Sequence, residues 1–199
     1  MNRQYPGYFD NEPDYPRLER AYALLGTDAT SGLAELRLLA ERGSPMSMVY
    51  LGWAYGHSEG VEKDLQQADR WYRMAIATGS VIAQHYLARQ YLRSRDFGEA
   101  QELLKLAVKQ DYPPSLYMLG RMRLLGIGGT RDAAEGAALL ERAMLLGNIP
   151  AKILLAQYLM VGNLGFGALL KGAWLSISAR AQFFYVALTQ GTDSERIRL

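Results

Sequence analysis

The sequence predicts an all-α fold: a right-handed superhelical solenoid built from antiparallel helix pairs. Three observations predict it. A small residue followed four positions later by Leu-Gly or Leu-Ala occurs four times, at spacings of 36, 32 and 36 residues. A second stripe of residues with helical spacing follows the first three occurrences, and glycine-rich segments separate several of the stripes. Repetition at this period is typical of stacked helical repeats. The four occurrences are Ser47/Leu51-Gly52, Ala83/Leu87-Ala88, Ser115/Leu119-Gly120 and Ala151/Leu155-Ala156.

The N-terminal part precedes the regular repeats. Residues 1–15 hold Pro6 and Pro13, which exclude a long helix, so we expect an arm that is either flexible or packed on the first hairpin. Residues 16–45 are predicted to form a degenerate first helical hairpin, because Gly32, Leu39 and Gly43 follow the pattern of the second helices.

Residues 46–182 are predicted to hold four repeats. Their expected bounds are about 46–81, 82–113, 114–149 and 150–182, with first helices over 46–58, 82–94, 114–125 and 150–161. The second helices are marked by residues spaced three, four and four apart: Ala68/Trp71/Ala75/Gly79, Ala100/Leu103/Ala107/Asp111 and Gly136/Leu139/Ala143/Gly147. This stripe predicts that Trp71 is a core residue. Asp64 and Asp132 are expected to cap the N-termini of second helices. At the C-termini, Gly79 and Gly147 suit the left-handed conformation that ends a helix, and Asp111 is a weaker substitute.

The C-terminal part departs from the pattern. Gly172, Leu175 and Ala179 start the fourth second-helix stripe, but Phe183 stands where the closing glycine is expected. Residues 183–199 are predicted to be an apolar cap and a short polar tail. Since terminal repeats need a polar outer face, the apolar stretch 168–190 either folds back as a cap or docks on a partner, a second copy or a membrane.

The first repeat carries a recognisable motif. It reads Leu51-Gly52-Trp53-Ala54-Tyr55, then a Gly60-Val61 loop ending in Asp64, then Ala68-x2-Trp71-Tyr72-x2-Ala75. This resembles the Sel1-like repeats (SLR), relatives of the tetratricopeptide repeat, and the resemblance covers about residues 32–182. It implies a helical-repeat scaffold that mediates protein–protein contacts, in signalling or in bacterial envelope and secretion systems.

Composition limits the function. The net charge of +2 argues against nucleic-acid binding, and without cysteine no disulfide or cysteine-based site is possible. The N-terminus lacks the apolar core of a signal peptide, so we expect a cytoplasmic protein, with peripheral membrane docking left open. The uncharged run 153–170 contains three glycines and an expected turn, so we do not read it as a membrane span.

No motif predicts catalysis, a cofactor or a metal. His57 and His85 lack further ligands at helical spacing, and Gly126–Thr130 lacks the strand and lysine of a phosphate loop, so we read it as an ordinary repeat loop. We therefore predict that the protein is not an enzyme.

The predicted binding surface is the inner groove formed by the first helices. In tetratricopeptide-type hairpins the inward positions lie two before, two after and six after the marker leucine. An aromatic anchor beside several arginines suits an acidic or carboxylate-bearing peptide. The predicted function is a non-catalytic adaptor that binds a protein or peptide partner in this groove. The alternative is an envelope-associated scaffold for polysaccharide export or secretion that docks by the C-terminal helix. Formation of a homo-oligomer through the C-terminal segment is left open. The groove residues are Trp53, His85, Arg89, Arg93, Tyr117, Arg121 and Gln157.

Overall fold

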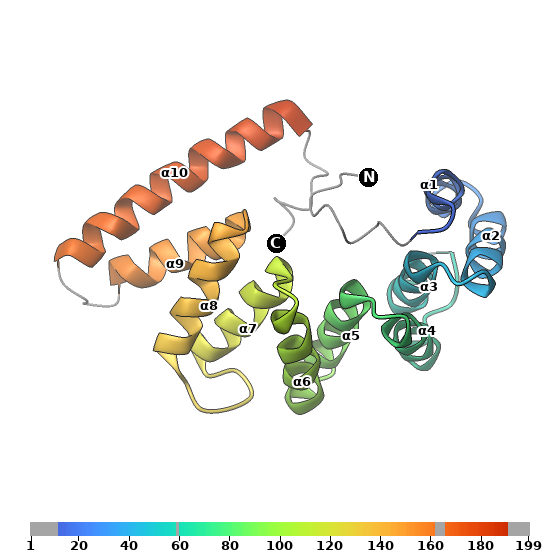
Figure 1. Ribbon diagram of the computed structural model, residues 1–199, viewed down its shortest axis with the longest axis horizontal. Helices are drawn as coiled ribbons and strands as arrows, with labels where there is room; N and C mark the ends of the chain where they lie inside the picture. The colour runs from blue at the N-terminus through green and yellow to red at the C-terminus, as the bar shows by residue number, and fades with distance from the viewer. Residues whose placement is uncertain (1–11, 59, 162–165, 191–199) are drawn as a thin grey trace. The chain divides into compact units, whose positions relative to one another are not determined.

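The computed structural model describes residues 12–58, 60–161 and 166–190, and over these residues the fold is all-α (Figure 1). Consecutive helices pack on one another from α1 to α5 and from α7 to α10, which confirms the predicted helical repeat. None of the helices in these ranges combines the length and apolar character needed to cross a membrane. The helices are α1 (Tyr15–Leu24), α2 (Ala29–Glu41), α3 (Pro45–His57), α4 (Leu65–Ala77), α5 (Val81–Arg93), α6 (Phe97–Lys109), α7 (Pro113–Leu125), α8 (Ala133–Leu145), α9 (Ile149–Val161) and α10 (Phe166–Gln190).

The chain forms two compact units that divide within α6, between Leu106 and Ala107. In the first unit α3 packs on α4, α1 on α2, and α3 also contacts α5. In the second unit α7 packs on α8 and α9 on α10, and α7 also contacts α9. Every helix from α2 to α9 has 13 residues, so the difference between the 36- and 32-residue spacings lies in the loops.

The helix ends follow the predicted chemistry. The carboxylates of Asp64 and Asp132 accept hydrogen bonds from backbone amides in the first turns of α4 and α8. Gly79 and Gly147 adopt φ values of 90° and 87°, and Asp111 takes the same left-handed region with φ 56°. A non-glycine residue is strained there, and Arg142 donates a 2.6 Å hydrogen bond from Nε to the Asp111 carboxylate.

Part of the N-terminal arm is attached to the first repeat. Residues 1–11 of the arm lie outside the described residues. The carboxylate of Glu12 accepts hydrogen bonds from Ser44 Oγ at 2.5 Å and from the backbone amide of Met46 at 2.6 Å. Glu12 therefore satisfies a backbone amide at the N-terminus of α3, where a negative charge is favourable.

The small residues of the second-helix stripe are buried as predicted, but the large core residue comes one position later than predicted. Trp71 is half-buried, whereas Tyr72 is 2% exposed and lies with Ala68 and Ala75 in the core. The cause is the close crossing of α3 and α4: a Cβ atom on Gly52 would lie only 2.7 Å from the Tyr72 ring. The same shift holds in α6 and α8, where Leu104 and Leu140 are fully buried and the predicted Leu103 and Leu139 are only half-buried.

The helix α10 is continuous from Phe166 to Gln190 and crosses the predicted boundary between the fourth repeat and the cap. The helix continues because Phe183 replaces the glycine that would allow a left-handed helix end at this position. The uncharged run 153–170 is divided between α9, which ends at Val161, and α10. The last nine residues, 191–199, lie outside the described residues.

Glycine at the α7–α8 crossing gives a stability prediction. A Cβ atom on Gly136 would lie 2.7 Å from the Leu124 backbone nitrogen and 2.9 Å from the Gly120 carbonyl oxygen. We expect Gly136→Ala to destabilise the fold by about 1–3 kcal/mol, because two backbones must separate. Gly98→Ala in α6 is the matched control: its Cβ would meet only Asp96 Oδ1 at 3.9 Å, so a gain of roughly 0.5–1 kcal/mol is expected. Urea denaturation of both variants tests this, and equal midpoints would contradict it.

Candidate functional site

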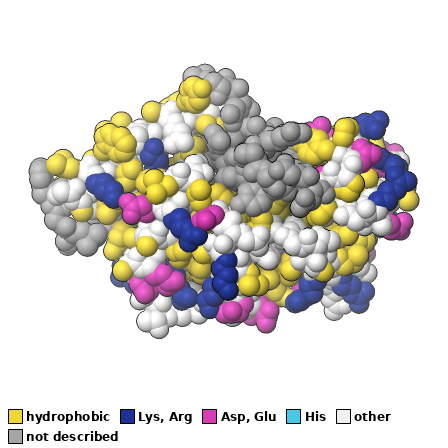
Figure 2. Space-filling view, viewed as in Figure 1, with side chains coloured by type: hydrophobic (Ala, Val, Ile, Leu, Met, Phe, Trp, Pro, Cys, Tyr) yellow, Lys and Arg dark blue, Asp and Glu magenta, His cyan; other side chains and the backbone are white. Residues whose placement is uncertain are grey.

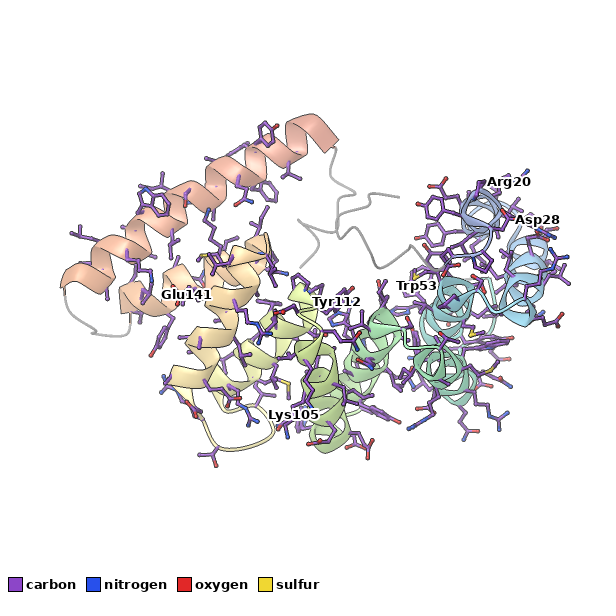
Figure 3. All side chains as sticks on the ribbon, in the orientation of Figure 1. Arg20, Asp28, Trp53, Lys105, Tyr112 and Glu141 are labelled. Carbon is purple, nitrogen blue, oxygen red and sulfur yellow. The ribbon has the colours of Figure 1, made fainter. Side chains whose placement is uncertain are left out.

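Aromatic rings of α1 and α3 form a shelf on the first unit. Trp53 projects from α3 and is half-buried (Figure 3). Its ring stacks on that of His57, one turn further along, with centroids 5.2 Å apart and an interplanar angle of 26°. The ring of Tyr22 from α1 has its centroid 6.5 Å from that of Trp53. We call Tyr22, Trp53 and His57 the aromatic shelf.

Arg93 of α5 is attached to the edge of this shelf. Its Nη2 atom lies 2.8 Å from His57 Nε2, and His57 Nδ1 lies 2.9 Å from the carbonyl oxygen of Trp53. Because a guanidinium can only donate, His57 Nε2 is the acceptor, and Nδ1 carries the proton that is donated to Trp53. The imidazole is therefore neutral, and its lone pair holds the Arg93 guanidinium at the edge of the aromatic shelf.

Arg89 lies one turn before Arg93 on the same helix. Its guanidinium carbon is 5.6 Å from the centroid of the Tyr86 ring, within the range of a cation–π contact. Desolvation lowers the pKa of the Arg93 guanidinium, and the charge of Arg89 lowers that pKa further. No carboxylate in the described ranges forms an ion pair with Arg89 or Arg93. We call these two residues the arginine pair; the positive charge of Arg89 is unfavourable for the charged form of Arg93.

His85 is inside the fold. Its side chain is 6% exposed, and burial, followed by the charge of Arg89, lowers its pKa to about 3. Val49, which holds the same register in the preceding repeat, is 1% exposed. This register therefore faces a neighbouring helix, and we leave His85 out of the proposed surface.

The second unit presents the remaining predicted groove residues. Arg121 of α7 and Gln157 of α9 are exposed, and Tyr117 of α7 is half-buried. The two helices contact each other within the unit. The groove predicted from Trp53 to Gln157 includes residues of both units and stays a prediction.

Three members of the site were not among the predicted groove residues: His57, which holds the inward position six after Leu51, and two tyrosines. Tyr22 belongs to α1, whose hairpin lacks the Leu-Gly marker, so no register could be assigned to it. Tyr86 lies outside the three inward positions, and only its neighbour Arg89 in the next turn would have pointed to it. For Tyr86, the signal that could have found it is an aromatic residue one helical turn before a predicted arginine.

The residues considered for chemistry hold structural positions. Among the described residues, no three His, Cys, Asp or Glu side chains are grouped so that they could hold a metal ion. Gly126 ends α7 with φ 71°, and its amide donates to the carbonyl of Met122. Arg131 of the same loop donates from Nε to the carbonyl of Leu124 at 3.0 Å. The loop after Gly126 thus closes a helix end.

Comparison with solved structures identifies the fold. The protective antigen c5321 of uropathogenic Escherichia coli, which has an SLR fold, matches with a TM-score of 0.70 and 22% identity over 89% of this chain and 41% of that protein. The chain therefore spans less than half the length of c5321. A Sel1 repeat protein from Oxalobacter formigenes matches with a TM-score of 0.71 and 20% identity over 85% of this chain and 70% of that one. The immunity protein PA5088 from Pseudomonas aeruginosa matches with a TM-score of 0.57 and 20% identity, over 92% and 74%.

Comparison of sequences gives the family. No curated protein matches the chain. The pattern of the Sel1 repeat matches three consecutive segments, residues 45–80, 81–112 and 113–148, which together are more than half of the chain. These segments coincide with α3–α4, α5–α6 and α7–α8. The predicted fourth repeat, 150–182, is outside the matched segments and stays a prediction. The chain belongs to the Sel1 repeat family.

Proposed function

We propose that the protein is a non-catalytic adaptor that binds an acidic segment of a protein partner at the aromatic shelf and the arginine pair. Sel1 repeat proteins generally mediate protein–protein interactions. The observation that carries the proposal is a pair of guanidinium groups on one helix, Arg89 and Arg93, that have no carboxylate partner in the described residues, with Arg93 bonded to His57 of the aromatic shelf.

The chemistry of this surface favours a peptide that carries both carboxylates and an apolar side chain. A carboxylate bound to a guanidinium forms a charge-assisted hydrogen bond that contributes about 1.5–3 kcal/mol when it is desolvated. The exposed parts of the Trp53 and His57 rings offer a flat face on which an aromatic or aliphatic side chain can pack. Such a pairing of an aromatic anchor with arginine is the composition of binding hot spots.

Charge reversal tests the proposed site. We expect Arg89→Glu/Arg93→Glu to reduce partner capture from a lysate of the source cells by at least about tenfold, because attraction to the ligand carboxylates becomes repulsion. The control Arg42→Glu/Arg70→Glu changes the net charge by the same amount. Arg42 follows α2 and Arg70 lies in α4, and both are exposed, so this control should leave capture intact. Circular dichroism checks folding. Equal capture by both folded double variants would place the site elsewhere.

A further variant tests whether the second unit takes part. Arg121→Glu alone is expected to weaken capture less than the double change, because Arg121 is exposed and an exposed ion pair contributes little. The effect of every reversal should shrink as salt is raised. A loss from Arg121→Glu that equals the loss from the arginine pair would shift the centre of the site to α7.

A second candidate function is neutralisation of a toxic protein partner. Its support is the fold shared with PA5088, which is named an immunity protein. Neutralisation uses the same adaptor surface but adds inhibition. If the captured partner arrests growth when it is expressed alone and not when it is expressed with this chain, neutralisation is supported; a harmless partner would leave the adaptor as the function.

A further inference from the structure

We propose that the protein forms a homodimer in which the α10 helices of two copies pack antiparallel through their outer faces. The outer face consists of Leu170, Trp174, Ile177, Ala181 and Phe184, spaced four, three, four and three residues apart. This spacing puts all five on one side of the helix, and it is the spacing of the seam between two packed helices. We call these five residues the α10 stripe.

The stripe is exposed in the single chain although it is apolar. Trp174 is 66% exposed, Ile177 68% and Phe184 65%. The helix packs on α9, and its opposite side carries buried residues that include Leu175, Ala179 and Val186. Figure 2 shows hydrophobic side chains along the edge of the second unit that α10 forms. A helix that is apolar on both sides is normally covered on both.

The stripe complements itself when one copy is reversed. Ile177 stands midway between Leu170 and Phe184, seven residues from each. In an antiparallel pair centred on Ile177, Trp174 lies near Ala181 of the second copy, so the largest side chain meets the smallest. A two-fold axis repeats this contact on the other side, as an isologous interface requires. A parallel pair would instead oppose the two Trp174 rings and the two Phe184 rings.

The area is sufficient for association. A tryptophan or phenylalanine side chain offers about 150–250 Å², so with two-thirds exposure these two give roughly 300 Å² in each copy. Leu170 and Ile177 raise the apolar area to about 500 Å² in each copy, or roughly 1,000 Å² in two copies, which is the lower bound of specific interfaces. Flanking residues of α10 add to this area.

Charge favours a second copy over a lipid surface. Helices that bind anionic membranes are rich in lysine and arginine, whereas α10 contains only Lys171 and Arg180. The ammonium group of Lys171 already pairs with the Glu141 carboxylate at 2.9 Å, and Lys152 lies 6.0 Å from the centroid of the Trp174 ring. The stripe itself carries no charge.

The oligomeric state of the full chain is the first test. Light scattering at about 100 μM, a concentration at which interfaces of this area associate, is expected to give twice the chain mass. Ile177→Glu should give the single-chain mass with unchanged helicity. The matched control is Leu145→Glu on α8, which alters a residue that is 78% exposed and outside the stripe, and it should stay dimeric. A wild-type chain with the single-chain mass overturns the proposal.

Cysteine cross-linking tests the antiparallel geometry. The chain has no cysteine, so one introduced thiol reports on one position. Ile177→Cys should form a covalent dimer under mild oxidation, because the two thiols face each other across the axis. The thiols of Leu170→Cys should not react, since they lie 14 residues apart along the helix axis, about 21 Å. Cross-linking at 170 without 177 would overturn the geometry, and single chains that sediment with phosphatidylcholine–phosphatidylglycerol vesicles would overturn the dimer in favour of a membrane surface.

Discussion

Replacing Tyr72 with alanine is expected to lower the free energy of unfolding by about 3–5 kcal/mol, the cost of emptying a fully buried aromatic site. The Tyr72 ring is 2% exposed, packs against the backbone at Gly52 of α3 and stacks with Tyr86 of α5 at a centroid distance of 6.2 Å. It therefore joins the first matched repeat to the second. Urea denaturation followed by circular dichroism measures the change.

Two controls make the result specific. Trp71→Ala removes a larger but half-buried side chain and should cost no more than about 1–2 kcal/mol. Gly52→Ala should destabilise the wild-type chain, because its Cβ would lie 2.7 Å from the ring, and should be nearly neutral when Tyr72 is already alanine. If Trp71→Ala were the more damaging change, the core register described above would be wrong.

His85 is expected to make the fold sensitive to mild acid. Its pKa falls from 6.5 in the unfolded chain to about 3 in the folded protein, because burial penalises the charged ring. The unfolded chain therefore binds one more proton between these values. The stability that neutral His85 provides is complete above pH 6.5 and is lost as pH falls toward 3, at about 1.4 kcal/mol per pH unit.

Comparison with an apolar variant isolates this effect. His85→Leu places an apolar side chain where the preceding repeat has Val49, so the fold should tolerate it. Denaturation midpoints at pH 7, 6 and 5 should fall more steeply for the wild type than for His85→Leu, because carboxylates titrate equally in both proteins. Parallel pH profiles for the wild type and His85→Leu would show that folding does not lower the pKa of His85.

Much of the fold could be predicted because the repeat marks backbone features. The Leu-Gly pairs place two helices in close contact, and Asp64, Gly79, Asp132 and Gly147 mark helix ends by their own hydrogen bonds and dihedral angles. These are local properties of a residue and its nearest neighbours. Predicted helix starts such as 46 and 82 therefore lie within one residue of the observed Pro45 and Val81.

Side-chain burial could not be predicted from the same marks. The choice between Trp71 and Tyr72 as the core residue depends on the angle at which α4 crosses Gly52, and residues three and four positions along a helix fit a stripe equally well. The two histidines show the same limit: His57 lies at the surface beside Arg93, while His85 is inside. Tyr22 was missed because its contact with Trp53 joins two helices whose relative register has no sequence marker.

The contacts between helices that are close in the chain have a consequence for folding during synthesis. Contacting helices in each unit are neighbours or next neighbours in the chain, so contacts join residues that are close in sequence. Chains with such low contact order fold quickly, since little loop entropy is lost before contacts form. During synthesis, the hairpin of α3 and α4 is complete before α6 has been made. Acquisition of structure can therefore follow the ribosome, one helix pair after another.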